Sequence, residues 1–232
     1  MRSMAILGAS LAFGCAGWNG IVPVTVDVPA GDPTSRRGVA VRIADTDDQR
    51  HFDFLARRSR IPSIQYQELI GRKGAKRVIG RSRSSGGGNL RLPGERTVED
   101  FVTDILTRSF REAGYAVTDD EGATAVEARV LEFWTWMTDR PFGLPSFQFR
   151  VRVAIRSDVE PFVGAGEAVC GEFFTVGTRS AETWAKTVRA GLAEFGEHVT
   201  RRLESPSSPV PAWYCTPLIR EDESVQDDTS AF

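Results

Sequence analysis

The clearest alternation of apolar and polar residues in this chain runs from Ser146 to Ser157. The odd-numbered positions 147 to 155 are all apolar, whereas the even-numbered ones are mostly arginines, with Gln148 among them. Successive side chains of a β-strand point to opposite faces, so the pattern is typical of a strand whose apolar side alone is covered. The chain must therefore supply elements that pack on that side.

Three further segments have the character of strands. Thr124 to Met137 and Gly164 to Val176 also alternate with a period of two. Gly38 to Ala44 is a short run rich in β-branched residues, and we expect the polar cluster Asp45 to Asp48 to end it. Four strands are therefore the minimum content of the sheet.

Between the first strand and the first helix, the pattern predicts an inserted hairpin. The two strand-like pieces are Ser63 to Ile70 and Arg77 to Arg81. They precede the glycine-rich stretch Ser84 to Asn89, which is typical of a flexible loop.

Two helices follow from capping signals and apolar spacing. Thr97 and Asp100 have the spacing of a capping box, and Gly114 stands where a residue in the left-handed conformation ends a helix. Ser180 has the position of an N-cap for the second helix. The apolar faces consist of Val98, Phe101, Val102, Ile105, Leu106, Phe110 and Ala113, and of Trp184, Val188, Leu192, Phe195, Val199 and Leu203.

The order strand, hairpin insert, helix, three strands, helix predicts an α+β fold. We expect a mostly antiparallel sheet with two helices packed on one face, plus the hairpin insert. The expected division is a signal peptide over residues 1–14, a tether over 15–37 and a single domain over 38–204, with the insert at 46–95. Residues 205–232 form a Pro/Ser-rich acidic tail, which we expect to be mobile.

Cys15 ends a short apolar stretch that begins at Met4 and is preceded by Arg2. A secretion signal combines a positive start, an apolar region of about 7–15 residues and a small residue before the cleavage point. The sequence LAFGC at 11–15 resembles the lipobox of bacterial lipoproteins, although Leu11 and Phe13 depart from the usual pattern. The resemblance implies palmitate and related acyl chains on Cys15, at the start of the mature chain. The alternative is a buried N-terminal strand or helix with an incidental cysteine.

The lipobox also implies a location and a redox environment. Residues 16 and 17 include no aspartate, which for lipoproteins implies sorting to the bacterial outer membrane, facing the periplasm. No run of 18 apolar residues occurs, so attachment to the membrane would rest on the lipid. With Cys15 acylated, Cys170 and Cys215 remain in an oxidising compartment and can form a disulfide.

No catalytic or metal-binding constellation stands out. The histidines are His51 and His198, and no G-x-S-x-G, C-x-x-C or H-x-x-x-H motif occurs. Asp45, Asp47 and Asp48 lack the glycine and distal glutamate of a calcium loop, so they predict a solvated turn. We therefore expect no catalytic residue, no metal, no cofactor and no enzymatic activity. A less favoured alternative is a hydrolase that uses His51 with one of these aspartates.

Basic residues concentrate in the insert, while the net charge of the whole chain is −2. That balance argues against a nucleic-acid partner. In a protein with a lipobox, we expect these basic residues to bind an anionic envelope polymer, an anionic lipid or an envelope protein. The alternative is a solvated hairpin without a partner. The candidate binding residues here are Arg72, Lys73, Lys76, Arg77 and Arg81.

Aromatic residues gather around the turn between the second and third predicted strands. Trp134, Trp136 and Phe142 are the candidate binding residues. Phe133 and Trp134 are consecutive, so we expect them on opposite faces of the sheet. Packing in the core is the alternative interpretation of the cluster.

These features resemble the YajG-like family of outer-membrane lipoproteins. The stretches that carry the resemblance are Cys15, Gly38 to Val41, Asp48 to Arg50, Gly114 to Val117, Arg150 to Ile155, Gly171 and the helix from Ser180. The resemblance implies an α+β domain similar to the TolB N-terminal and penicillin-binding-protein-activator domains, which bind partners and catalyse nothing. A weaker resemblance, through Cys15, Trp18 and the order of elements, is to the lipopolysaccharide-assembly lipoprotein.

The sequence thus predicts a non-catalytic, lipid-anchored protein of the cell envelope that binds another envelope component. The alternative is a subunit of an oligomeric envelope assembly or pore, in which the insert pairs across protomers through open strand edges.

Overall fold

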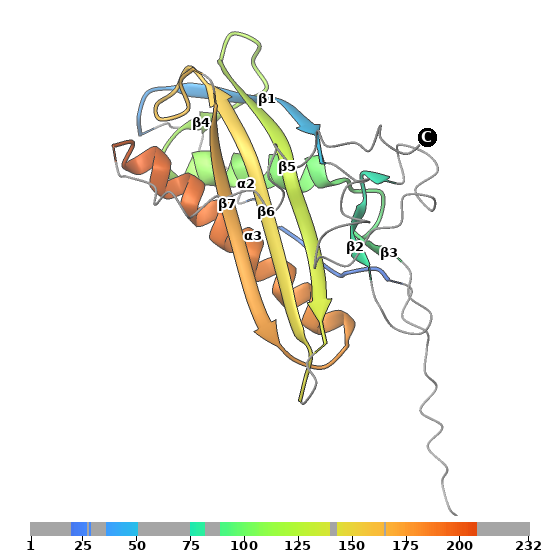
Figure 1. Cartoon of the computed structure of the whole chain (residues 1–232). Coiled ribbons are helices and arrows are strands. Elements are labelled where there is room, and N and C mark those ends of the chain that lie inside the picture. The colour runs from blue at the N-terminus through green and yellow to red at the C-terminus, as the bar shows by residue number, and fades with distance from the viewer. Residues whose placement is uncertain are drawn as a thin grey trace, which may run out of the picture.

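The computed structural model describes residues 20–26, 28, 36–50, 75–81, 89–139, 143–164 and 166–207, and the side chain of Arg81 is outside this description. Figure 1 shows the arrangement of its helices and strands. In chain order they are β1 (Ala40–Asp48), β2 (Val78–Arg81), β3 (Asn89–Arg91), α2 (Val98–Glu112), β4 (Ala116–Val117), β5 (Thr124–Thr138), β6 (Ser146–Ser157), β7 (Glu167–Val176) and α3 (Ala181–Glu204).

The described strands form one seven-stranded sheet. Its long part is the antiparallel series β5, β6 and β7, whereas β1 runs parallel to both β4 and β5. The parallel pairs arise because the chain passes through α2 before it returns to the sheet, and a crossover of this kind restores the strand direction. The predicted α+β class is confirmed, with a sheet that is more mixed than expected.

Both helices pack on the same face of the sheet, α2 beside β1 and α3 beside β6 and β7 (Figure 1). The capping box is present: Asp100 N–H donates to Thr97 Oγ1 at 3.2 Å, and Thr97 N–H donates to Asp100 Oδ2 at 2.7 Å. Gly114 has a φ of +90°, as its position after the helix predicted, and Ser180 caps α3. The helix boundaries expected from the sequence are therefore confirmed.

Aromatic side chains fill the layer between the helices and the sheet. Phe147 meets Trp184 edge to face at 4.7 Å between ring centroids, and Phe133 meets Phe149 at 5.1 Å. α3 lies close to β7 because Gly171 has no side chain: a Cβ there would be 2.3 Å from the carbonyl oxygen of Gly191.

Two expectations about the first half of the chain are wrong in detail. β1 continues through the polar cluster to Asp48, because residues 41–48 pair in parallel with β5 and so do not form a turn. β2 pairs with β3, and Asn89, which we expected in the loop, belongs to that partner strand. The predicted strand piece Ser63 to Ile70 lies outside the described residues.

The expected tether also ends earlier than residue 37. Val22 and Val24 are 0% and 1% exposed and belong to the core, and Ile21 forms a parallel bridge to Arg91 of β3. The alternating valines have the period of a strand, and their side chains pack against the domain. The chain therefore joins the core at Gly20, with only residues 16–19 between it and Cys15.

Candidate functional site

The sheet forks beside β5, and a buried arginine lies in the fork. One edge of β5 pairs with β1 as far as Val130 and with β2 at Thr135. In the gap between them, Arg50 Nη1 donates to the carbonyl oxygens of Val78 at 2.7 Å and Phe133 at 3.1 Å. The guanidinium thus supplies donors to backbone groups at the point where the strand partners of β5 change.

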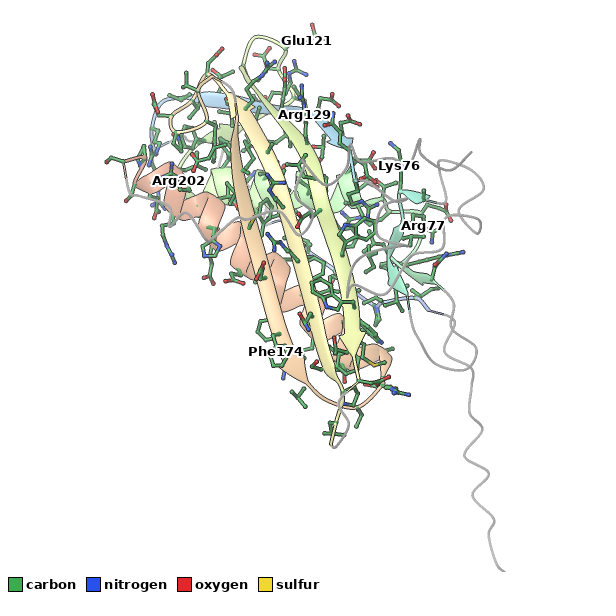
Figure 2. The ribbon with its side chains drawn as sticks, viewed as in Figure 1. Lys76, Arg77, Glu121, Arg129, Phe174 and Arg202 are labelled. Atoms are coloured by element: carbon green, nitrogen blue, oxygen red, sulfur yellow. The ribbon has the colours of Figure 1, made fainter. Side chains whose placement is uncertain are left out.

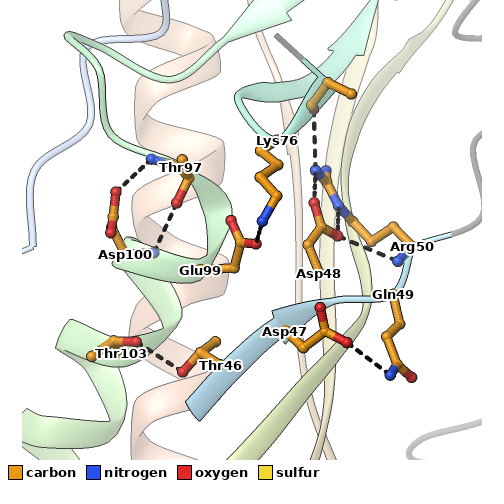
Figure 3. A network of polar contacts seen from close by, with 11 residues as sticks. Thr46, Asp47, Asp48, Gln49, Arg50, Lys76, Thr97, Glu99, Asp100 and Thr103 are labelled. Carbon is orange, nitrogen blue, oxygen red and sulfur yellow. Dashed lines mark hydrogen bonds and ion pairs between the residues drawn. The ribbon is translucent and has the colours of Figure 1, made fainter. Parts of the chain in front are cut away.

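Asp48 holds this guanidinium in a fork-to-fork pair (Figure 3). Arg50 Nε and Nη2 each lie 2.7 Å from a different oxygen of Asp48, and the two side chains are 0% and 2% exposed. The Arg50 guanidinium also lies 4.6 Å from the centre of the Trp134 ring. A buried pair of this geometry fixes the local structure, and it occupies both oxygens of Asp48.

The rest of the polar cluster has separate partners. Thr46 Oγ1 lies 2.8 Å from Thr103 Oγ1 on α2, and Gln49 donates to Asp47 at 2.9 Å (Figure 3). Within the described part of the chain, no group of three His, Cys, Asp or Glu residues is placed to hold a metal ion. His51, the histidine of the alternative hydrolase, lies outside the described residues.

We call the sheet face opposite the helices the outer face. Arg150 on β6 lies there between Glu132 on β5 and Glu172 on β7, with nitrogen–oxygen distances of 2.8 Å to each carboxylate. Arg150 and Glu132 are both 7% exposed. The outer face therefore carries a cross-strand ion network in which Arg150 and Glu132 are buried, while the Glu172 side chain is 56% exposed.

The predicted aromatic pair divides between the two faces as expected. Phe133 belongs to the helix-covered core, whereas Trp134 and Trp136 lie outside that core cluster. Both tryptophans are nevertheless buried, with 3% and 9% exposure. They therefore form no exposed patch, and Phe142 lies outside the described residues.

The two candidate binding residues of the insert whose side chains the structure describes, Lys76 and Arg77, are paired with acids. Lys76 contacts Glu99 at the start of α2, and this hydrogen bond raises the pKa of Lys76 against an opposing effect of burial. Arg77 lies 3.2 Å from Glu95. The side chains of Arg72, Lys73 and Arg81 are outside the described residues, so their predicted role stays a prediction.

Side chains of α3 cap the edge of β7. Glu172 N–H donates to Glu194 Oε2 at 2.9 Å, and His198 Nδ1 lies 2.9 Å from the Cys170 carbonyl oxygen. Burial raises the pKa of Glu194; for His198, burial and, secondarily, Arg201 lower the pKa. His198 is half-buried in this edge contact.

These contacts bear on pairing between protomers. In the described residues, the β3 edge is bridged by Ile21 at Arg91, and the middle of the β7 edge is capped by α3. Covered edges of this kind oppose strand pairing with a second chain. The oligomer alternative thus gains no support at these two positions.

Cys170 is completely buried and disulfide-bonded. The cysteine that it joins lies outside the described residues. The expected pairing with Cys215 therefore stays a prediction.

One end of the sheet is apolar and exposed. Leu144, Phe174 and Val176 are 52%, 51% and 43% exposed. Val176 pairs with Ser146 at the start of β6, directly beyond the loop that carries Leu144. We call these three residues the apolar end. The sequence holds one signal of this end: the consecutive phenylalanines at 173 and 174 require one of the two to face away from the helices.

Two solved structures are distantly similar to this chain. No protein-family model matches the chain, and no curated protein matches it. A minor lipoprotein from Acinetobacter baumannii is 15% identical over 46% of this chain and 83% of its own, with a TM-score of 0.35. A Xanthomonas campestris protein of the DUF330 family is 15% identical over 79% of this chain and 90% of its own, with a TM-score of 0.32. Both TM-scores are too low for these structures to assign a fold or a function to this chain.

Proposed function

We propose that the protein is a non-catalytic lipoprotein of the bacterial envelope, anchored by acyl chains on Cys15, whose domain binds another envelope component. The observation that carries the proposal is the apolar stretch that ends in Gly14 and Cys15, followed after residues 16–19 by a segment packed in the core. None of the helices in the described residues is long and apolar enough to cross a membrane. Lipid on Cys15 would supply the attachment, at the periplasmic side of the outer membrane.

The anchor is tested by metabolic labelling of cells with a palmitate analogue. We expect the parent protein and Cys215→Ser to be labelled equally, and Cys15→Ser to lose the label. The attachment depends on the acyl chains, and Cys15→Ser cannot carry them. This variant should therefore also leave the membrane fraction. Equal labelling of Cys15→Ser and the parent would contradict the proposal.

The disulfide of Cys170 gives a second, independent test. The chain has three cysteines, and a thiol that carries lipid cannot also be in a disulfide. If Cys15 is acylated, peptide mapping without reduction should find Cys170 linked to Cys215. A peptide in which Cys170 is linked to Cys15 would be incompatible with the anchor.

Binding of an envelope component is tested by crosslinking in cells through a photoreactive residue in place of Arg77. That side chain is on the insert and contacts only the exposed Glu95 and a carbonyl group among the contacts described. We expect a defined crosslinked species that disappears when Cys15→Ser removes the protein from the membrane. A crosslink unchanged by Cys15→Ser would show that its partner does not depend on the anchor.

A further inference from the structure

We propose that the apolar end of the sheet, formed by Leu144, Phe174 and Val176, rests on the lipid surface of the membrane that holds Cys15. The inference rests on the proposed lipid anchor, and it adds an orientation of the domain and a membrane-contacting surface. Three observations support it: the reach of the chain after Cys15, the strand register and the distribution of charge.

The chain between the anchor and the domain is short. Gly20 is fixed, because its carbonyl oxygen accepts from Arg91 N–H at 2.9 Å and Val22 N–H donates to the Arg91 carbonyl oxygen at 2.9 Å. A fully extended chain spans at most about 3.6 Å per residue, so Gly20 lies within roughly 18 Å of Cys15. The part of the domain around Gly20 must therefore lie close to the membrane.

Strand register places Gly20 near the end of β5. Gly20 lies against Asn89, since a Cβ on Gly20 would be 2.5 Å from the Asn89 carbonyl oxygen. Asn89 pairs with Arg81, and β2 runs parallel to β5 with Gly80 opposite Thr135. β5 ends three residues later at position 138, so Gly20 lies within roughly 10 Å of that level along the strands.

The apolar end lies at the same level of the sheet. Thr138 pairs with Ser146, which pairs with Val176 on β7. Phe174 is labelled at this end in Figure 2, and Glu121 is labelled at the opposite end. Exposed apolar side chains and the short connection to Cys15 therefore share one end of the domain.

The two loops at the opposite end are acidic, which gives the domain a polarity. Their exposed residues include Asp119, Asp120 and Glu121 in the β4–β5 loop, and Asp158 and Glu160 in the β6–β7 loop, while the exposed Arg129 and Arg156 lie on the adjoining strands β5 and β6. At the apolar end, the charges of Arg179 and Asp139 are paired at 2.5 Å. An anionic lipid surface repels carboxylates, while exposed leucine, phenylalanine and valine gain by leaving water. The polarity thus favours the apolar end as the side that meets the lipid.

The test measures contact with lipid directly. The acylated full-length protein, purified from membranes in detergent, is reconstituted into vesicles of phosphatidylethanolamine and phosphatidylglycerol. A photoreactive residue replaces Leu144 or, as the matched control, Val163. Val163 is 51% exposed, against 52% for Leu144, but it lies in the loop at the acidic end. We expect lipid adducts from position 144 at about tenfold the yield from position 163.

A second variant separates lipid contact from simple proximity. Val176→Glu places a carboxylate beside the probe at position 144 and should lower the adduct yield several-fold, whereas Val163→Glu should leave it unchanged. Both positions are exposed, so both variants should fold, which circular dichroism checks.

The possible failures are distinguishable. If the protein carries acyl chains and floats with the vesicles, but positions 144 and 163 give equal adducts, this inference is wrong and the anchor stands. If mass spectrometry finds no acyl chain on Cys15, the proposed function and this inference both fail.

Discussion

The fork beside β5 and the edge of β7 both contain backbone groups that are bound by side chains and not by a neighbouring strand. The two places differ in which side chains bind these groups and in how deeply those side chains are buried. At the fork these groups are bound by Arg50, whose side chain is 0% exposed and paired with Asp48. At the β7 edge they are bound by Glu194 and His198, which are only partly buried.

The difference shows how burial sets the energetic weight of a polar contact. A charge removed from water must keep every partner, so loss of one partner is costly. A charge that remains near water is screened, and its loss costs little. We therefore expect large effects from changes to the polar contacts of the fork, and small, pH-dependent effects from changes to the polar contacts of the β7 edge.

The largest expected effect comes from Arg50→Met. The change leaves Asp48 buried without its cation and the carbonyl groups of Val78 and Phe133 without a donor. Breaking a buried pair of this kind costs about 3–5 kcal/mol in the free energy of unfolding. Urea denaturation of the two proteins measures it.

A double variant provides the control for this prediction. Asp48→Leu combined with Arg50→Met removes both charges, so it should recover part of the stability that Arg50→Met loses. If Arg50→Met costs less than about 1 kcal/mol, the fork is not the rigid element that its contacts indicate.

The next largest effect is expected from Gly171→Ala, which tests whether the β7 edge depends on close packing of α3. The new Cβ would lie 2.3 Å from the Gly191 carbonyl oxygen and 2.6 Å from the Phe195 nitrogen. Backbone atoms cannot move aside cheaply, so we expect a loss of about 1–3 kcal/mol in thermal or urea unfolding.

The matched change is Gly122→Ala in the β4–β5 loop. Its Cβ would meet only the Asp120 side chain at 3.5 Å, an ordinary contact. If the two variants lose the same amount of stability, the close approach of α3 to β7 is not the reason why Gly171→Ala is destabilising.

The same contrast explains what sequence could predict. The capping box at Thr97 and Asp100 and the alternation of β6 are local patterns, and the structure confirms both. Asp48, the partner of Arg50, is only two positions away in the sequence, but the burial of this pair depends on where β1 and β2 end along β5. This long-range register cannot be recognised from the residues around Asp48, and the sequence therefore favours a solvated turn.

The segment after Cys15 shows the same limit. The sequence shows the alternation of Val22 and Val24. The residues against which this segment packs belong to β3, far along the chain, so the sequence alone favours a tether. Likewise, sequence indicated that Trp134 and Phe133 lie on opposite faces, but it could not show that the outer face is buried at Trp134.

A smaller, pH-dependent effect is expected at His198. Its pKa in the folded protein is lower than the ordinary value of 6.5, so below pH 7 the unfolded chain binds protons more readily. Stability should therefore fall as the pH drops through 6.5 towards the folded pKa. In His198→Asn, the amide can keep the bond to the Cys170 carbonyl group, and this part of the pH dependence should disappear. Urea midpoints between pH 5 and 8 measure it, and an unchanged slope would contradict the assignment.

The smallest effect, and the one of opposite sign, is expected from Glu194→Gln. Burial raises the pKa of Glu194 above 4.5, so the folded protein binds the proton more readily, and stability from this group falls as the pH rises through that window. A glutamine can still accept from Glu172 N–H and carries no charge. At pH 7 the variant should gain between zero and about 1 kcal/mol, with no gain at pH 4. A clear loss at pH 7 would mean that the carboxylate charge itself strengthens the cap on β7, and the contrast with the fork would then be one of degree.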